Sequence, residues 1–155
     1  MPTMIIAAQA QDLDQITEMW MDVSRQEFVQ FLGQDVIEFF IEHNDLREEV
    51  ECCSDTTYVY KQEDRVLGFV VLAEDLIELL VVRPECQNKN IGKQLYDYSI
   101  SLVAQQFHQV RAECIEQDEK ANKLLSARGF EYIGHYEDEM GFMRRQYQKQ
   151  LLEML

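Results

Sequence analysis

A turn rich in small polar residues and lysine, residues 87–93, has the composition of a phosphate-binding loop. It reads QNKNIGK and follows an apolar run, residues 75–82, which predicts a strand buried on both faces. Arg83-Pro84 ends that strand because proline cannot donate to a ladder. From Ile91 onward apolar residues recur at helical spacing, which predicts a helix. Backbone N–H groups at such a helix start, with the helix dipole behind them, form an anion cradle.

Lys89 and Lys93 bring positive charge to this turn in a chain of formal net charge −15. Because the chain as a whole is acidic, two basic residues in one turn favour a local anionic ligand such as phosphate. The alternative is an ordinary strand-to-helix connection with two solvated lysines, since turn motifs also match by chance. Local physics leaves both interpretations open.

Two carboxylates, Glu113 and Glu78, lie in runs that otherwise predict apolar strands. A strand carboxylate among apolar neighbours is suited to remove a proton from an ammonium group, directly or through water. Glu113 is the first candidate for a general base and Glu78 the second. The alternative is a solvated or ion-paired carboxylate, with Arg111 or Arg83 as its partner.

Length and composition indicate one domain, residues 1–155, with 46% hydrophobic content and a sizeable core. No apolar run approaches the length of a membrane span, and the N-terminus lacks a basic segment followed by a long apolar one. We therefore expect a cytoplasmic protein. The acidic balance disfavours nucleic acid or an anionic membrane as partner and favours a cationic small molecule or a peptide amine.

The four cysteines show no paired zinc spacing, which predicts reduced thiols and no metal site. Cys114 follows Glu113 directly, but no histidine adjoins it to activate a thiolate. A cysteine nucleophile is therefore not favoured.

The apolar patterns predict the element order β, α, α, β, β, β, α, β, α, β, β. Strands are expected at 3–8, 58–60, 65–73, 75–82, 108–114, 130–136 and 142–147, and helices at 12–31, 36–46, 91–107 and 118–127. The polar residues 47–55 predict a loop. Asp12 is the expected N-cap of the first helix and Gly33 its expected stop. The helical aromatic residues are expected mostly in the core: Trp20, Phe28, Phe31, Phe39 and Phe40.

The turn at 87–93 resembles motif A of the GNAT superfamily of N-acetyltransferases, in which Gln or Arg precedes a Gly-x-Gly/Ala turn. Gln87, Ile91 and Gly92 match. Asn90 replaces the first glycine, and asparagine is among the few residues that tolerate a positive φ. In the family this loop binds the pyrophosphate of acetyl-coenzyme A.

Residues 118–130 resemble the family's motif B, in which Asn and Ala precede a tyrosine and a Gly-Phe pair. Ala121, Gly129 and Phe130 match, whereas Asp118 replaces the asparagine. Leu125 stands where the family usually has the tyrosine that protonates the coenzyme A thiolate. The resemblance therefore leaves the general acid unassigned. Another group or water supplies the proton, or turnover is slow or absent.

The resemblance covers nearly the whole chain and implies an α/β fold, with a mixed sheet of about seven strands, four flanking helices and splayed central strands forming the acetyl-coenzyme A cleft. It implies acetyl transfer from acetyl-coenzyme A to a primary amine by direct attack. The alternative is an acyl-coenzyme A-binding regulatory module that has lost turnover. The implied coenzyme contacts are Leu80, Val81, Val82, Gln87, Asn88, Lys89, Asn90, Ile91, Gly92, Lys93 and Asp118. Some family members that acetylate peptide N-termini carry a catalytic glutamate at the position of Glu113.

The apolar C-terminal residues, Leu151, Leu152, Met154 and Leu155, are unusual for a free tail. They predict packing on the chain's own domain or on a second copy in a homodimer. No residue pattern identifies the amine acceptor.

Overall fold

The computed structural model describes residues 3–43, 46–87, 89–138 and 141–151. The chain falls into two compact units. The N-terminal unit comprises Met1–Val71 and Leu80–Tyr98, and the C-terminal unit comprises Leu72–Leu79 and Ser99–Leu155.

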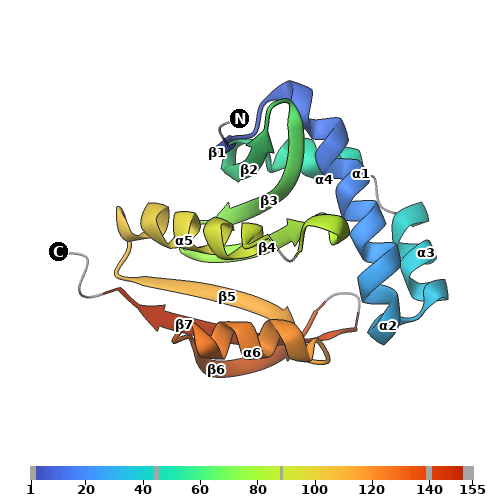
Figure 1. The fold of residues 1–155 in the computed structure, drawn as a ribbon. Coiled ribbons are helices and arrows are strands. Elements are labelled where there is room, and N and C mark those ends of the chain that lie inside the picture. The colour runs from blue at the N-terminus through green and yellow to red at the C-terminus, as the bar shows by residue number, and fades with distance from the viewer. Residues whose placement is uncertain (1–2, 44–45, 88, 139–140, 152–155) are drawn as a thin grey trace. The chain divides into compact units, whose positions relative to one another are not determined.

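Seven strands form a mixed sheet in the order β1-β2-β3-β4-β5-β7-β6 (Figure 1), which confirms the predicted α/β architecture. The strands are β1 Thr3–Ala7, β2 Thr57–Gln62, β3 Arg65–Ala73, β4 Leu76–Val82, β5 Gln109–Ile115, β6 Glu131–Glu137 and β7 Met143–Gln150. The helices are α1 Leu13–Val23, α2 Val29–Leu32, α3 Gln34–His43, α4 Leu46–Cys52, α5 Ile91–Ala104 and α6 Glu119–Ala127. The predicted element order is confirmed, with one additional helix, α4.

In the N-terminal unit, β2 pairs antiparallel with both β1 and β3. The first turns of α5 lie close to β3, because a Cβ built on Gly68 would be 3.0 Å from the Val81 carbonyl oxygen and 3.1 Å from side-chain atoms of Ile91 and Leu95. Any side chain at this position would push against a backbone atom. Gly68 therefore allows the start of α5 to sit directly on the strands, where Ile91 and Leu95 are buried.

The first helix continues through a π-helical segment, Ser24–Phe28, into α2, and ends at Gly33, whose φ is +88°. The predicted stop at Gly33 is thus confirmed. Asp12 precedes α1 as its N-cap residue, but its carboxylate serves the turn before it, accepting a hydrogen bond from the Gln9 N–H at 2.9 Å. The same carboxylate forms a buried ion pair with Lys61 of β2, at 2.6 Å.

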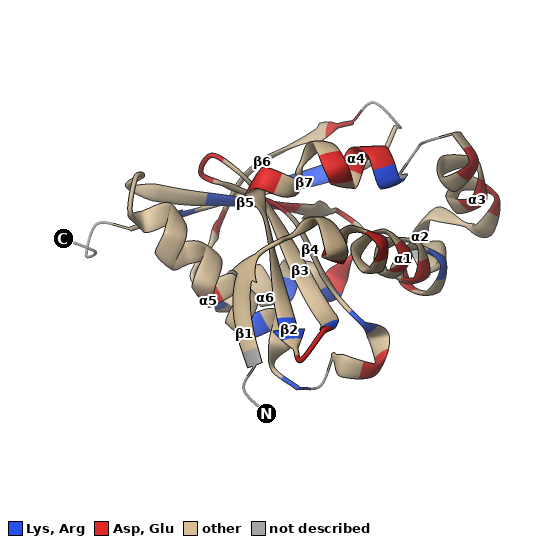
Figure 2. Cartoon of the chain, turned by 90° about the horizontal axis from the view of Figure 1, so that it is seen from above, with Lys and Arg blue, Asp and Glu red and all other residues tan. Residues whose placement is uncertain are grey.

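The predicted loop at 47–55 is wrong, because most of it forms α4. Val50 is buried, and Arg47 binds Asp14 of α1 at 2.9 Å and Glu51 one turn ahead at 3.5 Å. The buried Val50 side chain and these ion pairs stabilise a helix whose composition is mostly polar. Figure 2 shows that α1, α3 and α4 all carry acidic side chains.

The expectation that most helical aromatic residues are core is also wrong. Phe39 is 56% exposed and stacks on His43 one turn later, with ring centroids 4.0 Å apart. Trp20 and Phe40 are half-buried and meet edge to face at 6.2 Å, and Phe28 is half-buried as well. The side chain of Phe31 lies outside the described residues. Short helices with wide exposed faces leave these rings only partly covered.

In the C-terminal unit, β7 lies between β5 and β6 and pairs antiparallel with both, while β4 pairs parallel with β5 at Leu76↔Arg111 and Ile77↔Ala112. Burial alternates along β5 as predicted: Val110, Ala112 and Cys114 are buried. The helix α6 lies against these strands (Figure 1), and its Leu125 is 1% exposed.

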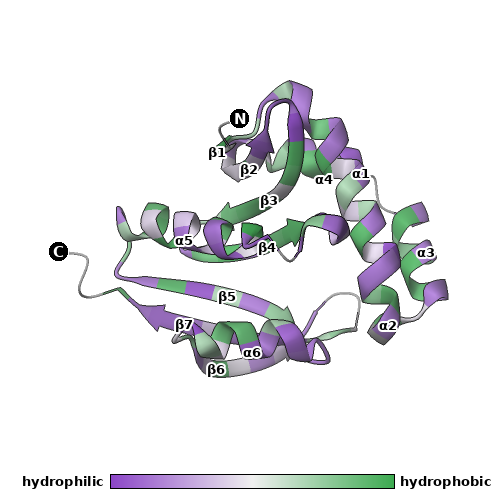
Figure 3. Cartoon of the chain, in the orientation of Figure 1, coloured by the Kyte–Doolittle hydropathy of each residue, from purple (hydrophilic) through white to green (hydrophobic). Residues whose placement is uncertain are grey.

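Apolar residues concentrate in β3, where only the first and last residues are not buried (Figure 3). The prediction that β4 is buried on both faces is wrong, since Glu78 is exposed and Leu79 and Leu80 are half-buried. Across the described part of the chain, no helix is both long and apolar enough to cross a lipid bilayer.

Candidate functional site

The turn that leads into α5 has the backbone of an anion-binding loop. A short 3₁₀ turn, Pro84–Cys86, follows β4, and the Lys89 N–H bonds the Cys86 carbonyl at 3.2 Å. Asn90 then adopts φ +62°, the left-handed conformation expected from the sequence. Glycine and asparagine reach this conformation at the lowest cost, so Asn90 preserves the turn that a glycine would form.

The start of α5 presents backbone donors beside a glycine and two exposed lysines. The first N–H groups of a helix have no partner within it, and the Gln94 N–H is the one that bonds back to the Asn90 carbonyl, at 3.1 Å. A Cβ on Gly92 would lie 3.7 Å from the Val82 side chain and 3.9 Å from that of Leu80, ordinary contact distances. Lys89 and Lys93 are exposed beside this helix start. The donors, the helix dipole and the two cations fit a phosphate group.

Three hydrogen bonds hold the start of this turn within the N-terminal unit. The Arg83 Nε donates to the Val66 carbonyl at 2.6 Å, and the Arg83 N–H donates to the Leu67 carbonyl at 3.0 Å. The Gln87 amide donates to a carboxylate oxygen of Glu27, in the π-helical segment. Arg83 therefore serves the strand β3 rather than acting as partner to either candidate base.

The remaining predicted coenzyme contacts fall in different environments. Val81, Val82 and Ile91 are buried, and Leu80 is half-buried. Asn88 lies outside the described residues. Asp118 caps α6, with its carboxylate accepting a hydrogen bond from the Ala121 N–H at 3.1 Å. Contact of any of these residues with coenzyme A stays a prediction.

The candidate base Glu113 is half-buried in β5 and accepts a hydrogen bond from the Tyr136 phenol at 2.6 Å. Burial, followed by this hydrogen bond, raises the pKa of Tyr136 to about 12, which keeps the phenol protonated as a donor. Glu78, the second candidate, is exposed in β4 rather than lying among buried neighbours. Among the described residues, Glu113 has a hydrogen-bonding partner for its carboxylate, whereas Glu78 shows none.

Arg111 lies two residues before Glu113 on the same face of β5, but it binds another carboxylate. Its Nε and one Nη donate to Asp75 Oδ1 at 3.0 and 2.7 Å, and Gln109 donates to the other Asp75 oxygen at 3.1 Å. The hydrogen bond from Arg111 lowers the pKa of Asp75. Arg111 and Arg83 were the two arginines considered as ion-pair partners for Glu113. Arg111 instead binds Asp75, and Arg83 instead binds backbone carbonyl groups of β3.

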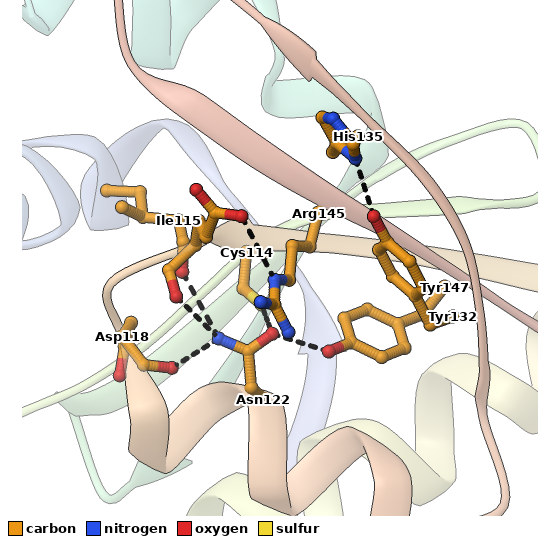
Figure 4. A network of polar contacts seen from close by, with 9 residues as sticks. Cys114, Ile115, Asp118, Asn122, Tyr132, His135, Arg145 and Tyr147 are labelled. Carbon is orange, nitrogen blue, oxygen red and sulfur yellow. Dashed lines mark hydrogen bonds and ion pairs between the residues drawn. The ribbon is translucent and has the colours of Figure 1, made fainter.

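A network centred on Asn122 joins α6 to the end of β5 (Figure 4). The Asn122 amide nitrogen donates to the carbonyl groups of Ile115, Glu116 and Asp118, at 3.4, 3.2 and 2.8 Å. Its oxygen accepts from the Tyr147 phenol and from the Cys114 thiol. Asn122 therefore holds in place the strand that carries Glu113.

The thiol of Cys114 is part of this network, and its environment does not favour a nucleophile. Burial, with a smaller contribution from Asp118, raises its pKa to about 11, so the thiolate is scarce at neutral pH. Leu125 fills the core beneath α6 and supplies no hydroxyl. The phenols of Tyr132, Tyr136 and Tyr147 each contact a polar side chain of the C-terminal unit.

The family model for the acetyltransferase (GNAT) domain matches residues 21–151. The chain belongs to the GNAT acetyltransferase family. The suspected resemblance is thereby confirmed, and the match includes both the turn before α5 and the helix α6. A search of curated proteins by sequence finds no match.

Solved GNAT structures share this fold across almost their full length. The PaiA N-acetyltransferase of Thermoplasma acidophilum, in complex with coenzyme A, has a TM-score of 0.79 at 15% identity, covering 97% of this chain and 99% of that one. The yncA protein of Salmonella typhimurium, with acetyl-coenzyme A, has a TM-score of 0.69 at 16% identity and coverages of 97% and 95%. A ribosomal-protein-alanine N-acetyltransferase of Brucella melitensis has a TM-score of 0.73 at 16% identity and coverages of 96% and 99%. At these identities the likeness shows the GNAT fold alone.

Sequence reasoning missed three residues of this GNAT domain: Glu27, Asn122 and Tyr136. Glu27 and Gln87 are 60 positions apart, and no local pattern pairs them. Asn122 lies one residue after the motif alanine, inside an ordinary helical pattern. Tyr136 lies in a run that predicts a strand, and the strand pattern does not specify which side chain its phenol contacts.

Proposed function

We propose that this GNAT protein is an N-acetyltransferase that moves the acetyl group of acetyl-coenzyme A to a primary amine by direct attack. The observation that carries the proposal is the backbone of the turn at Asn90 and Gly92. It combines the left-handed residue, a glycine at the helix start and two exposed lysines at the position where the family binds pyrophosphate. Coenzyme A and acetyl-coenzyme A in the PaiA and yncA structures support the same cofactor assignment.

The turn residues bind the cofactor in this proposal. The N–H groups at the start of α5 and the side chains of Lys89 and Lys93 would hold the pyrophosphate, and the backbone of β4 from Leu80 to Val82 the pantetheine arm. Acetyl-coenzyme A would supply an activated thioester when bound. Gly92 would allow the phosphate to approach the backbone closely, because glycine adds no side chain of its own at this position.

Glu113 would act as the general base. It would remove one proton from the acceptor ammonium, so that the neutral amine could attack the thioester carbonyl. As the carbon–sulfur bond breaks, the nitrogen would lose its second proton to water and become the amide. The leaving thiolate takes a proton from water, since Leu125 provides none. An unperturbed thiol has a pKa of about 8.5, so the thiolate is a good leaving group without a dedicated acid.

The acceptor in this proposal is a cationic amine, either a small molecule or a peptide N-terminus. The formal net charge of −15 favours cations, and acidic side chains occupy α1, α3 and α4. The ribosomal-protein-alanine N-acetyltransferase neighbour places peptide amines among the acceptors to test. Action in the cytoplasm and pairing into a homodimer belong to the same proposal and rest on the sequence.

The second candidate function is a coenzyme-binding regulatory module without turnover. The buried Leu125 favours it, because no hydroxyl can protonate the thiolate from that position. Both functions predict that acetyl-coenzyme A raises the thermal midpoint, since a ligand that binds only the folded state stabilises it.

Release of free thiol from acetyl-coenzyme A, measured over polyamines, aminoglycosides and peptide N-termini, separates the two functions. Turnover with any of these amines supports the acetyltransferase. Cofactor binding without turnover across the panel supports the regulatory module. Absence of a thermal shift at millimolar acetyl-coenzyme A would contradict both.

A further inference from the structure

The phenol of Tyr136 reaches Glu113 across an intervening strand of the C-terminal unit. Glu113 is opposite Gln146 of β7, which in turn is opposite Gly134 of β6. Tyr136 follows Gly134 by two residues, so the two residues share a face of the strand. Gly134 carries no side chain that could block the diagonal between the tyrosine and the glutamate. The contact at 2.6 Å is the result of this arrangement.

Two arginines on the strands around Glu113 are bound by other carboxylates. Arg111, on the same face of β5, binds Asp75 at 2.7 Å, and Arg144, opposite the residue two positions after Glu113, binds Asp138 at 2.8 Å. Within each of these two pairs, the arginine and the aspartate neutralise each other's charge. The contact of Glu113 that the described residues show is thus with a neutral phenol.

A neutral hydrogen-bond donor orients a carboxylate and places no opposite formal charge beside it. The hydrogen bond fixes Oε1 of Glu113, and rotation of the carboxylate about its last torsion angle is restricted. The other oxygen, Oε2, then has a defined direction. Such orientation matters for rate, because a misplacement of about 1 Å at a reacting group can cost about a hundredfold.

We propose that Tyr136 is a positioning residue, which holds the carboxylate of Glu113 so that Oε2 accepts the proton of the acceptor amine. This inference rests on the proposed acetyltransferase function. Tyr136 itself exchanges no proton in the reaction. Because the pKa of its phenol is raised to about 12, the hydroxyl stays a donor throughout the neutral and mildly alkaline range.

The chain offers a matched control for the test, Tyr132. It lies on the same strand β6 and is exposed to a similar degree, 50% against 38% for Tyr136. Its hydroxyl contacts the Nδ1 of His135 instead of Glu113. Tyr136→Phe and Tyr132→Phe therefore remove the same group from one edge strand, and only the first removes a contact with the base.

The test measures kcat and KM of the full chain with acetyl-coenzyme A and the best acceptor amine, between pH 6 and 9.5, for wild type, Tyr136→Phe, Tyr132→Phe and Glu113→Gln. We expect Tyr136→Phe to lower kcat by about ten- to a hundredfold near neutral pH, with KM for the coenzyme unchanged within about twofold. The loss should shrink as pH rises, because more acceptor arrives already deprotonated. Tyr132→Phe should match wild type.

A double variant makes the role of Tyr136 distinguishable from a merely structural one. In the Glu113→Gln background, Tyr136→Phe should cause less than about a twofold further loss, since the carboxylate that it positions is absent. Equal losses in both backgrounds, or an equal loss at every pH, would overturn the inference. Full activity of Tyr136→Phe would overturn it as well. Failure of the wild type to turn over any amine would overturn the proposed function and the inference together, whereas the other outcomes leave the proposed function intact.

Discussion

Replacing Gly92 by glutamate should remove most of the affinity for acetyl-coenzyme A, whereas replacing it by alanine should not. A Cβ at this position meets the side chains of Val82 and Leu80 at 3.7 and 3.9 Å, so a methyl group fits without displacement. Alanine also favours a helix by up to about 1 kcal/mol over glycine. The alanine variant is therefore the control for folding and for steric tolerance.

The glutamate variant adds a negative charge beside the bound phosphate. With about 5 Å between the added carboxylate and a pyrophosphate carrying two charges, Coulomb's law in bulk water gives a penalty of about 1.7 kcal/mol, and a lower effective dielectric makes it larger. The dissociation constant should thus rise at least about fifteenfold. The exposed Lys89 and Lys93 do not cancel this loss of affinity, because each lysine can pair with the new carboxylate only by giving up its contact with the phosphate.

A thermal shift assay reports the change directly. At a ligand concentration a hundred times the wild-type dissociation constant, binding stabilises the protein by about 2.7 kcal/mol, a rise of about 5–10 °C for a chain of this size. The same concentration should raise the midpoint of Gly92→Glu by less than half as much, and that of Gly92→Ala by the full amount. A folded Gly92→Glu with a wild-type shift would refute the assignment of this loop to the pyrophosphate.

Four other outcomes can be measured on single variants. Glu113→Gln should lower turnover at least about a hundredfold near neutral pH with coenzyme binding nearly unchanged, and a loss that stays constant as pH rises would refute its role as a base. Asp75→Asn should lower the thermal midpoint at pH 7. Because Arg111 lowers the pKa of Asp75 in the folded protein, the stability from this carboxylate is present above its unfolded pKa of about 3.9 and is lost as pH falls through the folded value. The difference between variant and wild type should therefore shrink below about pH 4, and an equal difference at every pH would contradict the assignment. Gly68→Ala should destabilise the protein by about 1–3 kcal/mol in chemical denaturation, since the added methyl would meet a backbone oxygen at 3.0 Å. Truncation after Lys149 removes Leu151, which is 7% exposed, and should cost about 1.5–3 kcal/mol; unchanged stability and unchanged mass in solution would show that the C-terminus packs on neither its own domain nor a second copy.

Periodicity and turn chemistry predicted most of the fold because these signals are local. The hairpin between β2 and β3, the stop at Gly33 and the alternation of β5 each follow from a few adjacent residues. Short α4 was missed because its stability comes from outside the segment, through Val50 and the ion pair of Arg47 with α1. The exposure of Phe39 was missed for the related reason that an amphipathic pattern does not say how wide a face is covered.

The part of the site formed by one continuous motif could be predicted from the sequence. The part that depends on the register between strands could not. The turn with Asn90 at positive φ follows from residue types alone. The contact between Tyr136 and Glu113 depends on an irregular register between Tyr132 and Gly134, which decides the face on which later residues of β6 lie. A one-residue shift moves every following side chain to the other face of the sheet, and the sequence of β6 contains no pattern that predicts this shift.

The buried pair of Lys61 and Asp12 restricts how this sequence can change over evolutionary time. Both side chains are less than a tenth exposed, and they meet at 2.6 Å. Loss of either partner alone leaves an uncompensated charge in the interior, at a cost of about 3–5 kcal/mol, which is much of the stability of an ordinary domain. An apolar pair of similar volume at the two positions would be tolerated about as well as the ion pair. Single substitutions at these sites are therefore selected against, and descendants of this protein should keep both charges or lose both together.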